Sequence, residues 1–185
     1  MPSFQIHLAI AKRYTEKHKI EDKEAFIEGS IAPDFVKPKE ISHYTIPVQT
    51  EALWDHLEAK VDLNRFLKEN KIKTDYDRGV LLHLVADKIF YTEFYSKEFI
   101  ESTNYHQFTK DLYTSYDQTN EYLEGKYHIV LKQPLAEKIR KEIEGSKKHQ
   151  QVSDETGKNI IPLDKLDAFI ERMSDVNLEE YMTKE

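Results

Sequence analysis

The chain has no cysteine among its 185 residues. This absence excludes a disulfide framework, a thiolate zinc site and a thiol nucleophile. Any metal site must therefore be built from imidazole and carboxylate ligands, and the sequence offers 8 histidines and 34 acidic residues for that purpose.

Glycine and proline are scarce, with 5 and 6 residues respectively. Such a low content favours helices over a turn-rich all-β chain. The hydrophobic share of 39% and the aromatic share of 11% are enough to form a core, and one domain is the default at this length. We therefore predict a single all-α domain over residues 1–185, with six or seven helices.

Long apolar runs and an excess of basic residues are also missing. No segment approaches the ~20 apolar residues that cross a bilayer, and the N-terminal residues do not have the pattern of a secretory leader. The formal net charge of −7 argues against nucleic-acid binding through a basic surface. These patterns predict a cytoplasmic protein without a transmembrane segment, and they leave its oligomeric state undetermined.

Cap and turn residues divide the chain into expected helices. Ser3 can cap a helix that runs to near His18, and a helix over residues 23–28 should end at Gly29. An irregular, proline-containing stretch follows over residues 30–49. Later helices are expected from Thr50 through Phe66, over about 75–95, from about 108 to Gly125, from Pro134 to Gly145 and over about 163–173, with a possible short strand at 126–131.

The most informative segment is Gly79 to Phe90, which from residue 80 on is apolar except for His83, Asp87 and Lys88. A helix that is apolar almost all round is a buried one, and residues four apart lie on the same face. A buried carboxylate is costly unless a cation, a metal or hydrogen bonds compensate it. His83 and Asp87 therefore form either a hydrogen-bonded core pair or two metal ligands on a rigid helix.

The irregular stretch adds two candidates, Asp34 after Pro33 and His43 after Ser42. Each alone is typical of an ordinary turn or surface residue. Together with His83 and Asp87 they would make a set of two nitrogens and two carboxylates that suits zinc and is acceptable to iron or manganese. His7 lies among apolar residues, as a core histidine does, and is a candidate only because the other four exist.

The order of these residues resembles the bacterial zinc-dependent phospholipase C family, which is related to the single-strand-specific nucleases. The resemblance rests on His7, the Gly-Ser-Ile-Ala-Pro-Asp34 segment, Ser-His43 and His83-x-x-x-Asp87 in an apolar helix, and covers roughly residues 1–95. It implies an all-α fold with clustered zinc ions that cleave phosphoester bonds. It further implies that Asp34, His43, His83 and Asp87 hold one zinc ion, and that Asp87 bridges to a second ion held partly by His7.

The sequence departs from the family at a third metal position. The family has a histidine six residues after the helix aspartate, where this chain has Glu93, and a later His-x-x-x-Glu, where this chain has His106 and Lys110. We therefore expect one or two zinc ions, with Glu93 as a possible ligand. In the family, the free N-terminal amine of the mature enzyme also binds metal. Here His7 follows the initiator region directly, with no leader to remove, so the sequence does not predict that ligand.

The leading prediction is a metal-dependent hydrolase of a small phosphoester substrate that uses a metal-activated water. Asp34 is the candidate catalytic residue, either as a base or as a group that orients water. The alternative is a non-catalytic or degenerate metal-binding protein that keeps the helical scaffold for ligand or partner binding. A third class, the HD-type helical phosphohydrolases, requires an adjacent His-Asp pair, and Asp55-His56 has the reverse order. Glu28, Asp55 and Tyr44 are possible hydrogen-bond partners for ligand histidines.

Overall fold

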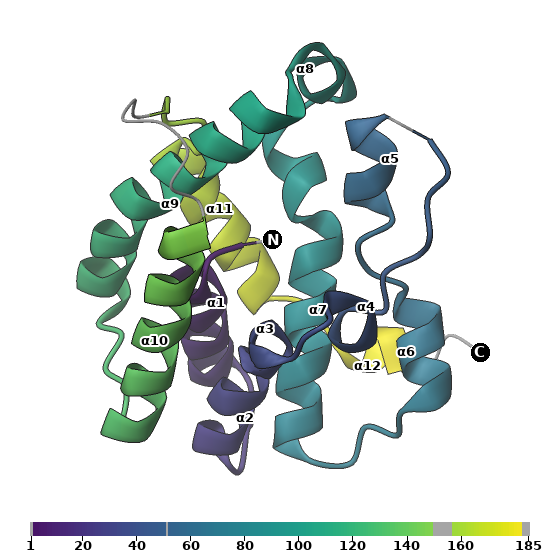
Figure 1. Ribbon diagram of the computed structural model, residues 1–185. Helices are drawn as coiled ribbons and strands as arrows, with labels where there is room; N and C mark the ends of the chain where they lie inside the picture. Colours follow the sequence, from purple (N-terminus) through teal and green to yellow (C-terminus); the bar gives the residue numbers. More distant parts are fainter. Residues whose placement is uncertain (1, 51, 150–156, 183–185) are drawn as a thin grey trace.

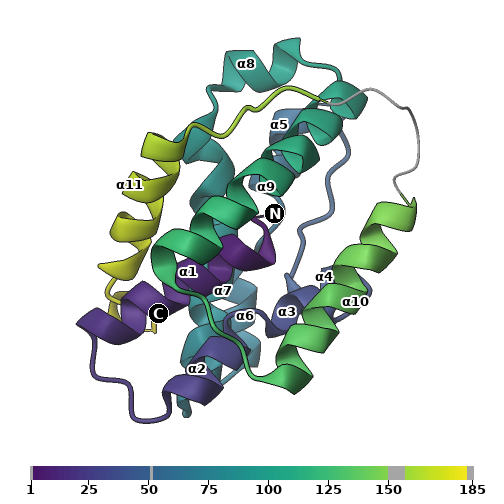
Figure 2. The same cartoon turned by 90° about the vertical axis from the view of Figure 1, so that its left-hand side faces the viewer.

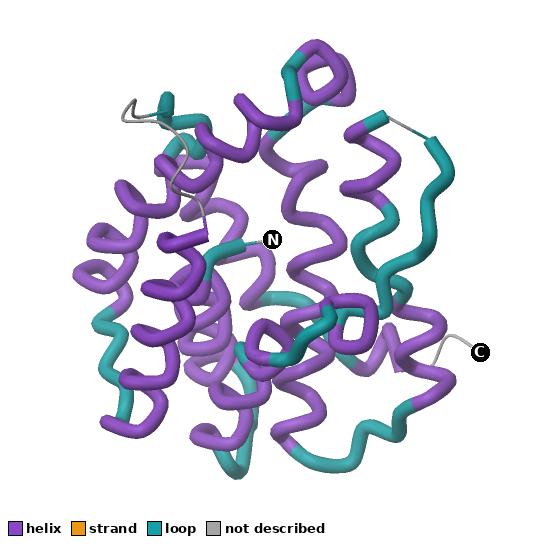
Figure 3. The backbone as a smooth tube through the Cα atoms, in the orientation of Figure 1, coloured by secondary structure: helices purple, strands orange, loops and turns teal. Residues whose placement is uncertain are grey.

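A computed structural model describes residues 2–50, 52–149 and 157–182, and within these ranges the chain forms helices and loops without any strand (Figures 1 and 3). The all-α prediction is confirmed, but the helices of the described residues are more numerous than six or seven. They are α1 (Phe4–Lys17), α2 (Lys23–Gly29), α3 (Ala32–Phe35), α4 (Lys39–Ser42), α5 (Leu53–Glu58), α6 (Leu63–Glu69), α7 (Asp75–Phe94), α8 (Lys97–Ser102), α9 (Tyr105–Tyr127), α10 (Gln133–His149), α11 (Leu163–Ser174) and α12 (Glu179–Met182).

Helices α1 and α7 form the centre of the molecule. Helices α9 and α11 pack against α1, and α2 packs along α7 (Figures 1 and 2). The short helices α3 and α4 lie over the α1–α7 pair, and α5 and α6 flank α7 on the side away from α9. The main core joins buried residues of these elements, among them Ile6, Ile10, Leu81, Phe90 and Ile170.

Two helix starts follow the predicted cap residues. The Ser3 side chain accepts a hydrogen bond from the Ile6 amide at the start of α1. Thr74 and Asp77 form a reciprocal capping box at the start of α7, which satisfies two backbone amides that have no partner inside the helix. The two helices that carry His7, His83 and Asp87 are therefore fixed at their N-terminal ends by side chains.

The region from Thr50 to Phe66 was predicted as one helix and is two. Thr50 does not cap α5; its hydroxyl donates instead to the Asp55 carboxylate at 2.6 Å. Asp62 begins α6, because its side chain accepts from the Arg65 amide and its backbone lies outside the helical region. A cap residue in the middle of a helical apolar pattern divides the pattern into two elements.

The predicted strand at 126–131 and two predicted helix ends were wrong. Helix α9 continues to Tyr127 and ends at His128, whose φ of 47° is left-handed. Gly125 and Gly145 lie inside α9 and α10, where a Cβ atom would meet nothing within 4 Å. Glycine lowers helix stability without ending a helix, so flanking residues decide where it stops.

The crossing of α2 and α7 is a contact between backbones. A Cβ atom on Gly29 would lie 2.1 Å from the Tyr76 carbonyl oxygen, and one on Gly79 would lie 2.1 Å from the Phe26 carbonyl oxygen. Both positions therefore require glycine for the close approach. This approach brings the end of α2 against the His83 turn of α7.

Within the described ranges, no helix has the length and apolar character that crossing a membrane requires.

Candidate metal centre

All five predicted ligands are buried and lie close together in the interior. Their relative exposures range from 1% for the three histidines and Asp87 to 6% for Asp34. Potential ligand atoms form two groups, each with all its atoms within 4.8 Å of one another: His7 with His83 and Asp87, and Asp34 with His43 and His83. His83 belongs to both groups.

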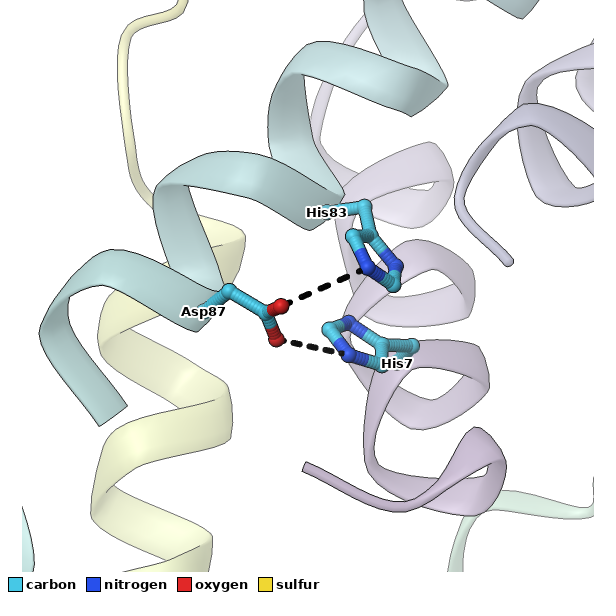
Figure 4. Close-up of side chains that lie close together, drawn as sticks. All are labelled: His7, His83 and Asp87. Atoms are coloured by element: carbon cyan, nitrogen blue, oxygen red, sulfur yellow. Dashed lines mark ion pairs between the residues drawn. The ribbon is translucent and has the colours of Figure 1, made fainter. Parts of the chain in front are cut away.

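The first group joins α1 to α7 (Figure 4). The Nε2 atom of His7 lies 3.3 Å from Asp87 Oδ1, and the Nε2 atom of His83 lies 3.6 Å from Asp87 Oδ2. The two imidazole rings are stacked, with centroids 3.8 Å apart and planes 17° from parallel. Both side chains of α7 therefore point to α1, as the four-residue spacing predicts.

The tautomer of His83 is set by the backbone at the end of α2. Its Nδ1 lies 2.8 Å from the Ser30 carbonyl oxygen. A carbonyl only accepts hydrogen bonds, so Nδ1 carries the proton and donates it. The lone pair of His83 is consequently on Nε2, which faces the other ligands. This is the arrangement that a metal-binding histidine adopts.

The second group comes from the two short helices. Asp34 lies on α3, directly after Pro33 in the first turn, and His43 follows the last residue of α4. The Nε2 atom of His43 lies 3.6 Å from Asp34 Oδ1, 3.2 Å from Asp87 Oδ2 and 3.2 Å from His83 Nε2. His43 therefore connects the two carboxylates.

Tyr44 holds the chain directly after His43. Its φ of 55° is left-handed, a conformation that costs about 1–2 kcal/mol for a residue with a side chain. Its carbonyl accepts from the Asp62 amide at 3.1 Å, its hydroxyl accepts from Asn70 at 2.6 Å, and its ring packs edge-on against Phe66. These contacts maintain the turn that directs His43 inward.

Burial and neighbouring charges act in opposite directions on the acids. Burial would raise the pKa of Asp34 and of Asp87, but His43 beside Asp34 and His83 beside Asp87, together with the other nearby histidines, hold both pKa values below the usual range. Burial, with the neighbouring His7, lowers the pKa of His83 to about 3. The centre therefore contains two ionised carboxylates and a neutral His83, which are the protonation states that bind a metal ion.

Three buried atoms in the centre make no hydrogen bond with any described residue: Nε2 of His7 and both carboxylate oxygens of Asp87. Buried polar groups are normally satisfied, and an ionised carboxylate without a partner is especially costly. A cation between these atoms would remove that cost. The buried His/Asp clusters could therefore hold a metal ion, and their nitrogen and oxygen donors fit zinc, iron or manganese.

The other residues considered from the sequence lie elsewhere. Glu93 forms an ion pair with Arg172 and belongs to neither group. Asp55 accepts from Thr50, and His56 lies 2.8 Å from the Thr50 carbonyl oxygen, so neither supports a ligand histidine. The partner of His83 is instead the backbone of Ser30, which no side-chain pattern could have indicated.

Lys39 and Lys60 were missed by the sequence analysis. Lys39 donates to Asp34 Oδ1 at 2.8 Å and to the Asp34 carbonyl at 3.0 Å. Lys60 lies over the Tyr91 ring, with Nζ 5.1 Å from its centroid. Both line a cavity of about 330 Å³ that Asp34 also lines. The sequence indicated the Lys39 contact only through its five-residue spacing from Asp34. Lysine is so common on protein surfaces that this spacing does not predict a contact.

No protein-family model, no curated protein and no solved structure matches this chain, so the site is interpreted from its own geometry.

Proposed function

We propose that this protein hydrolyses a phosphoester bond with the help of a divalent metal ion, zinc in the first place. Asp34, His43, His83 and Asp87 would hold the ion, and His7 with the other oxygen of Asp87 offers a second position. The observation that supports this most is the buried Asp87 carboxylate, which lies among three histidines without a hydrogen bond to any described residue.

The position of the cavity supports hydrolysis over simple metal storage. Asp34 belongs to the ligand cluster and also lines the cavity, so a molecule in the cavity would lie against the metal centre. A divalent ion there would lower the pKa of a bound water and polarise a phosphoryl oxygen. Water would add its oxygen to phosphorus while the bond to the ester oxygen breaks, and a proton would pass to the leaving alcohol.

The chain's own residues would orient the reactants. The lowered pKa of Asp34 makes this carboxylate a weak base, so we assign it to accepting a hydrogen bond from water and directing it. Apolar side chains would exclude bulk water from the cavity and strengthen these interactions. They are Leu53, Leu57, Tyr91, Phe108 and Leu112.

Metal content and turnover, measured on the same preparation, test the proposal. We expect about one equivalent or more of zinc, iron or manganese by emission spectroscopy, and activity on a panel of phosphomonoesters, phosphodiesters and phospholipid headgroup substrates. His83→Ala should lose both properties. The matched control is His56→Ala, because His56 is an exposed histidine outside both groups. Turnover that survives in His83→Ala would refute the assignment.

One contact favours a second candidate, a metal-binding protein without turnover. The Lys39 ammonium group forms an ion pair with one carboxylate oxygen of Asp34. This ammonium group would compete with a metal ion for the same oxygen. Stoichiometric metal together with no turnover on the whole panel would support this second function and reject the first.

A further inference from the structure

The cavity beside the centre combines an apolar wall with cationic groups. Buried side chains of α5, α7 and α9 form much of the wall, among them Leu57, Tyr91, Phe108 and Leu112. The charged lining residues are Asp34, Lys39 and Lys60, the ion pair of Lys37 with Glu142, and the exposed Asp117. Apolar walls with a few convergent polar groups are typical of small-molecule sites.

Lys60 lacks a countercharge in the described part of the chain. It is partly buried, its Nζ lies over the Tyr91 ring, and it forms no ion pair with any acid that the structure describes. Burial lowers the pKa of Lys60, because removing an ammonium group from water disfavours its charged form. An anion in the cavity would supply the missing charge.

Lys39 faces the same cavity from α4. Its ammonium group is 33% exposed and donates to Asp34, which is the ligand residue nearest the cavity. If a metal ion takes over the Asp34 carboxylate, the ammonium group of Lys39 is available to a second anion beside it. Both lysines therefore line the cavity that Asp34 also lines.

We propose that Lys39 and Lys60 form a subsite for the phosphate of a phosphomonoester dianion whose alcohol is small and apolar. This inference deepens the proposed function and rests on it, because it names the substrate class of the same site. The apolar wall would contact the alcohol, and the lysines would bind the phosphate oxygens that the metal does not.

Charge favours a dianion over the monoanion of a phosphodiester. One divalent ion would balance the carboxylates of Asp34 and Asp87, Lys37 is already paired with Glu142, and Asp117 is exposed to solvent, so the ammonium groups of Lys39 and Lys60 would remain inside the cavity. Their two positive charges equal the charge of a phosphomonoester dianion, whereas a diester would leave one uncompensated. Buried charges are stable only when they are paired.

Size limits the alcohol. The cavity volume of about 330 Å³ is near the lower end of ligand sites. This volume accommodates a phosphate with one ring or a short chain. A substrate with two long acyl chains would have to extend outside it.

Calorimetric titration with phenylphosphonate, a non-hydrolysable dianion at mildly alkaline pH, tests the subsite on zinc-loaded and on chelator-treated protein. Lys60→Met should weaken binding by about tenfold or more in both states, because charge-assisted hydrogen bonds are lost. Lys68→Met removes the same charge from an exposed position of α6 and should leave binding unchanged. Lys60→Arg keeps the charge and should retain most of the affinity, which separates a binding role from a folding defect.

The monomethyl ester of the same phosphonate is the matched monoanion, and it should bind about tenfold more weakly than the dianion. Equal binding of the two probes, or an equal loss in Lys60→Met and Lys68→Met, would overturn the subsite. If a phosphoester is hydrolysed but Lys60→Met binds phenylphosphonate normally, the subsite fails and the proposed function stands. If Lys60→Met weakens phosphonate binding in a protein that takes up no metal, the anion subsite is supported and the proposed hydrolysis is rejected.

Discussion

Asp87 illustrates how one residue can serve several partners. Its two oxygens lie 3.2–3.6 Å from the Nε2 atoms of His7, His43 and His83, and neither makes a hydrogen bond with the described residues. The carboxylate therefore has three imidazoles around it but no hydrogen bond to offset its burial. The negative charge is thus placed for a bound cation and at a cost to the metal-free protein.

Asp87→Asn keeps the shape of the side chain and removes its charge. We expect zinc affinity to fall by at least about 100-fold, since even residues that only orient metal ligands contribute 10–100-fold. Chelator competition measures the affinity, and urea unfolding measures the stability.

The control for this substitution is Asp55→Asn, whose carboxylate binds Thr50 outside both groups. Zinc affinity that stays the same in Asp87→Asn would contradict the assigned role. A large loss of stability in the metal-free variant would instead assign Asp87 to the packing of the core.

At the same scale, side chains with helical spacing were predictable and backbone contributions were not. His83 and Asp87 stand out because polar residues are rare in an apolar helix. The positions of Asp34 and His43 were expected from their place in a proline-containing stretch, although that stretch contains α3 and α4. Ser30 binds through its carbonyl, which every residue has, so its identity carries no signal.

The close crossing of α2 and α7 determines the position of His83. Gly29 and Gly79 permit the contact, and the contact places the Ser30 carbonyl on His83 Nδ1 at 2.8 Å. An added methyl group would separate the two helices and lengthen this hydrogen bond. The metal centre thus depends on residues that touch none of its ligand atoms.

Gly79→Ala should therefore destabilise the metal-free protein by about 1–3 kcal/mol, as overpacking does. Zinc affinity should fall by about tenfold as His83 loses its orienting partner. In Gly125→Ala the new methyl group meets nothing within 4 Å, so that variant should gain about 0.5–1 kcal/mol from the lower entropy of its unfolded chain. Urea unfolding and zinc titration of both variants check these values, and equal stabilities would show that the crossing tolerates a side chain.

Element boundaries were predictable where a cap residue coincided with the end of an apolar pattern. Helices α1 and α7 satisfy both conditions. The prediction of one helix over the α5–α6 region was wrong because Asp62 interrupts an otherwise continuous apolar pattern. The predicted end of α10 at Gly145 was wrong because the residues around this glycine continue the helix.

For the whole molecule, the first half of the chain supplies the candidate ligands, and both halves supply the cavity wall. All five candidate ligands lie between residues 7 and 87, whereas α9 and α10 close the cavity with Phe108, Leu112 and Ile143. The cavity wall could not be predicted from the sequence, because apolar residues at helical spacing indicate a core whether or not a cavity lies beside them.

Metal would connect elements that are weakly fixed on their own. Helices α3 and α4 have four residues each and no side-chain cap, so their local stability depends on the contacts of Asp34 and His43. We expect zinc at 100 times its dissociation constant to raise the unfolding free energy by about 2.7 kcal/mol. Hydrogen exchange should slow most strongly over residues 31–43 and much less in α10, which carries no ligand.

Exchange mass spectrometry with zinc and with chelator measures this pattern. The His83→Ala variant is its control, because zinc should leave its exchange rates unchanged. Protection that is equal in α10 and in residues 31–43 would mean that the ion binds away from the centre.

The shared position of His83 limits how the centre can fill. A neutral imidazole has one nitrogen whose lone pair can bind a metal ion. The Ser30 carbonyl fixes the proton of His83 on Nδ1, so the single lone pair on Nε2 is shared by both ligand groups. An ion held by Asp34, His43 and His83 would take this lone pair, and a second ion would then have only His7 and Asp87 from the chain. Under the proposed function, loading would therefore be stepwise, with one tight and one weak event, and the stoichiometry of the protein would follow the supply of metal around it.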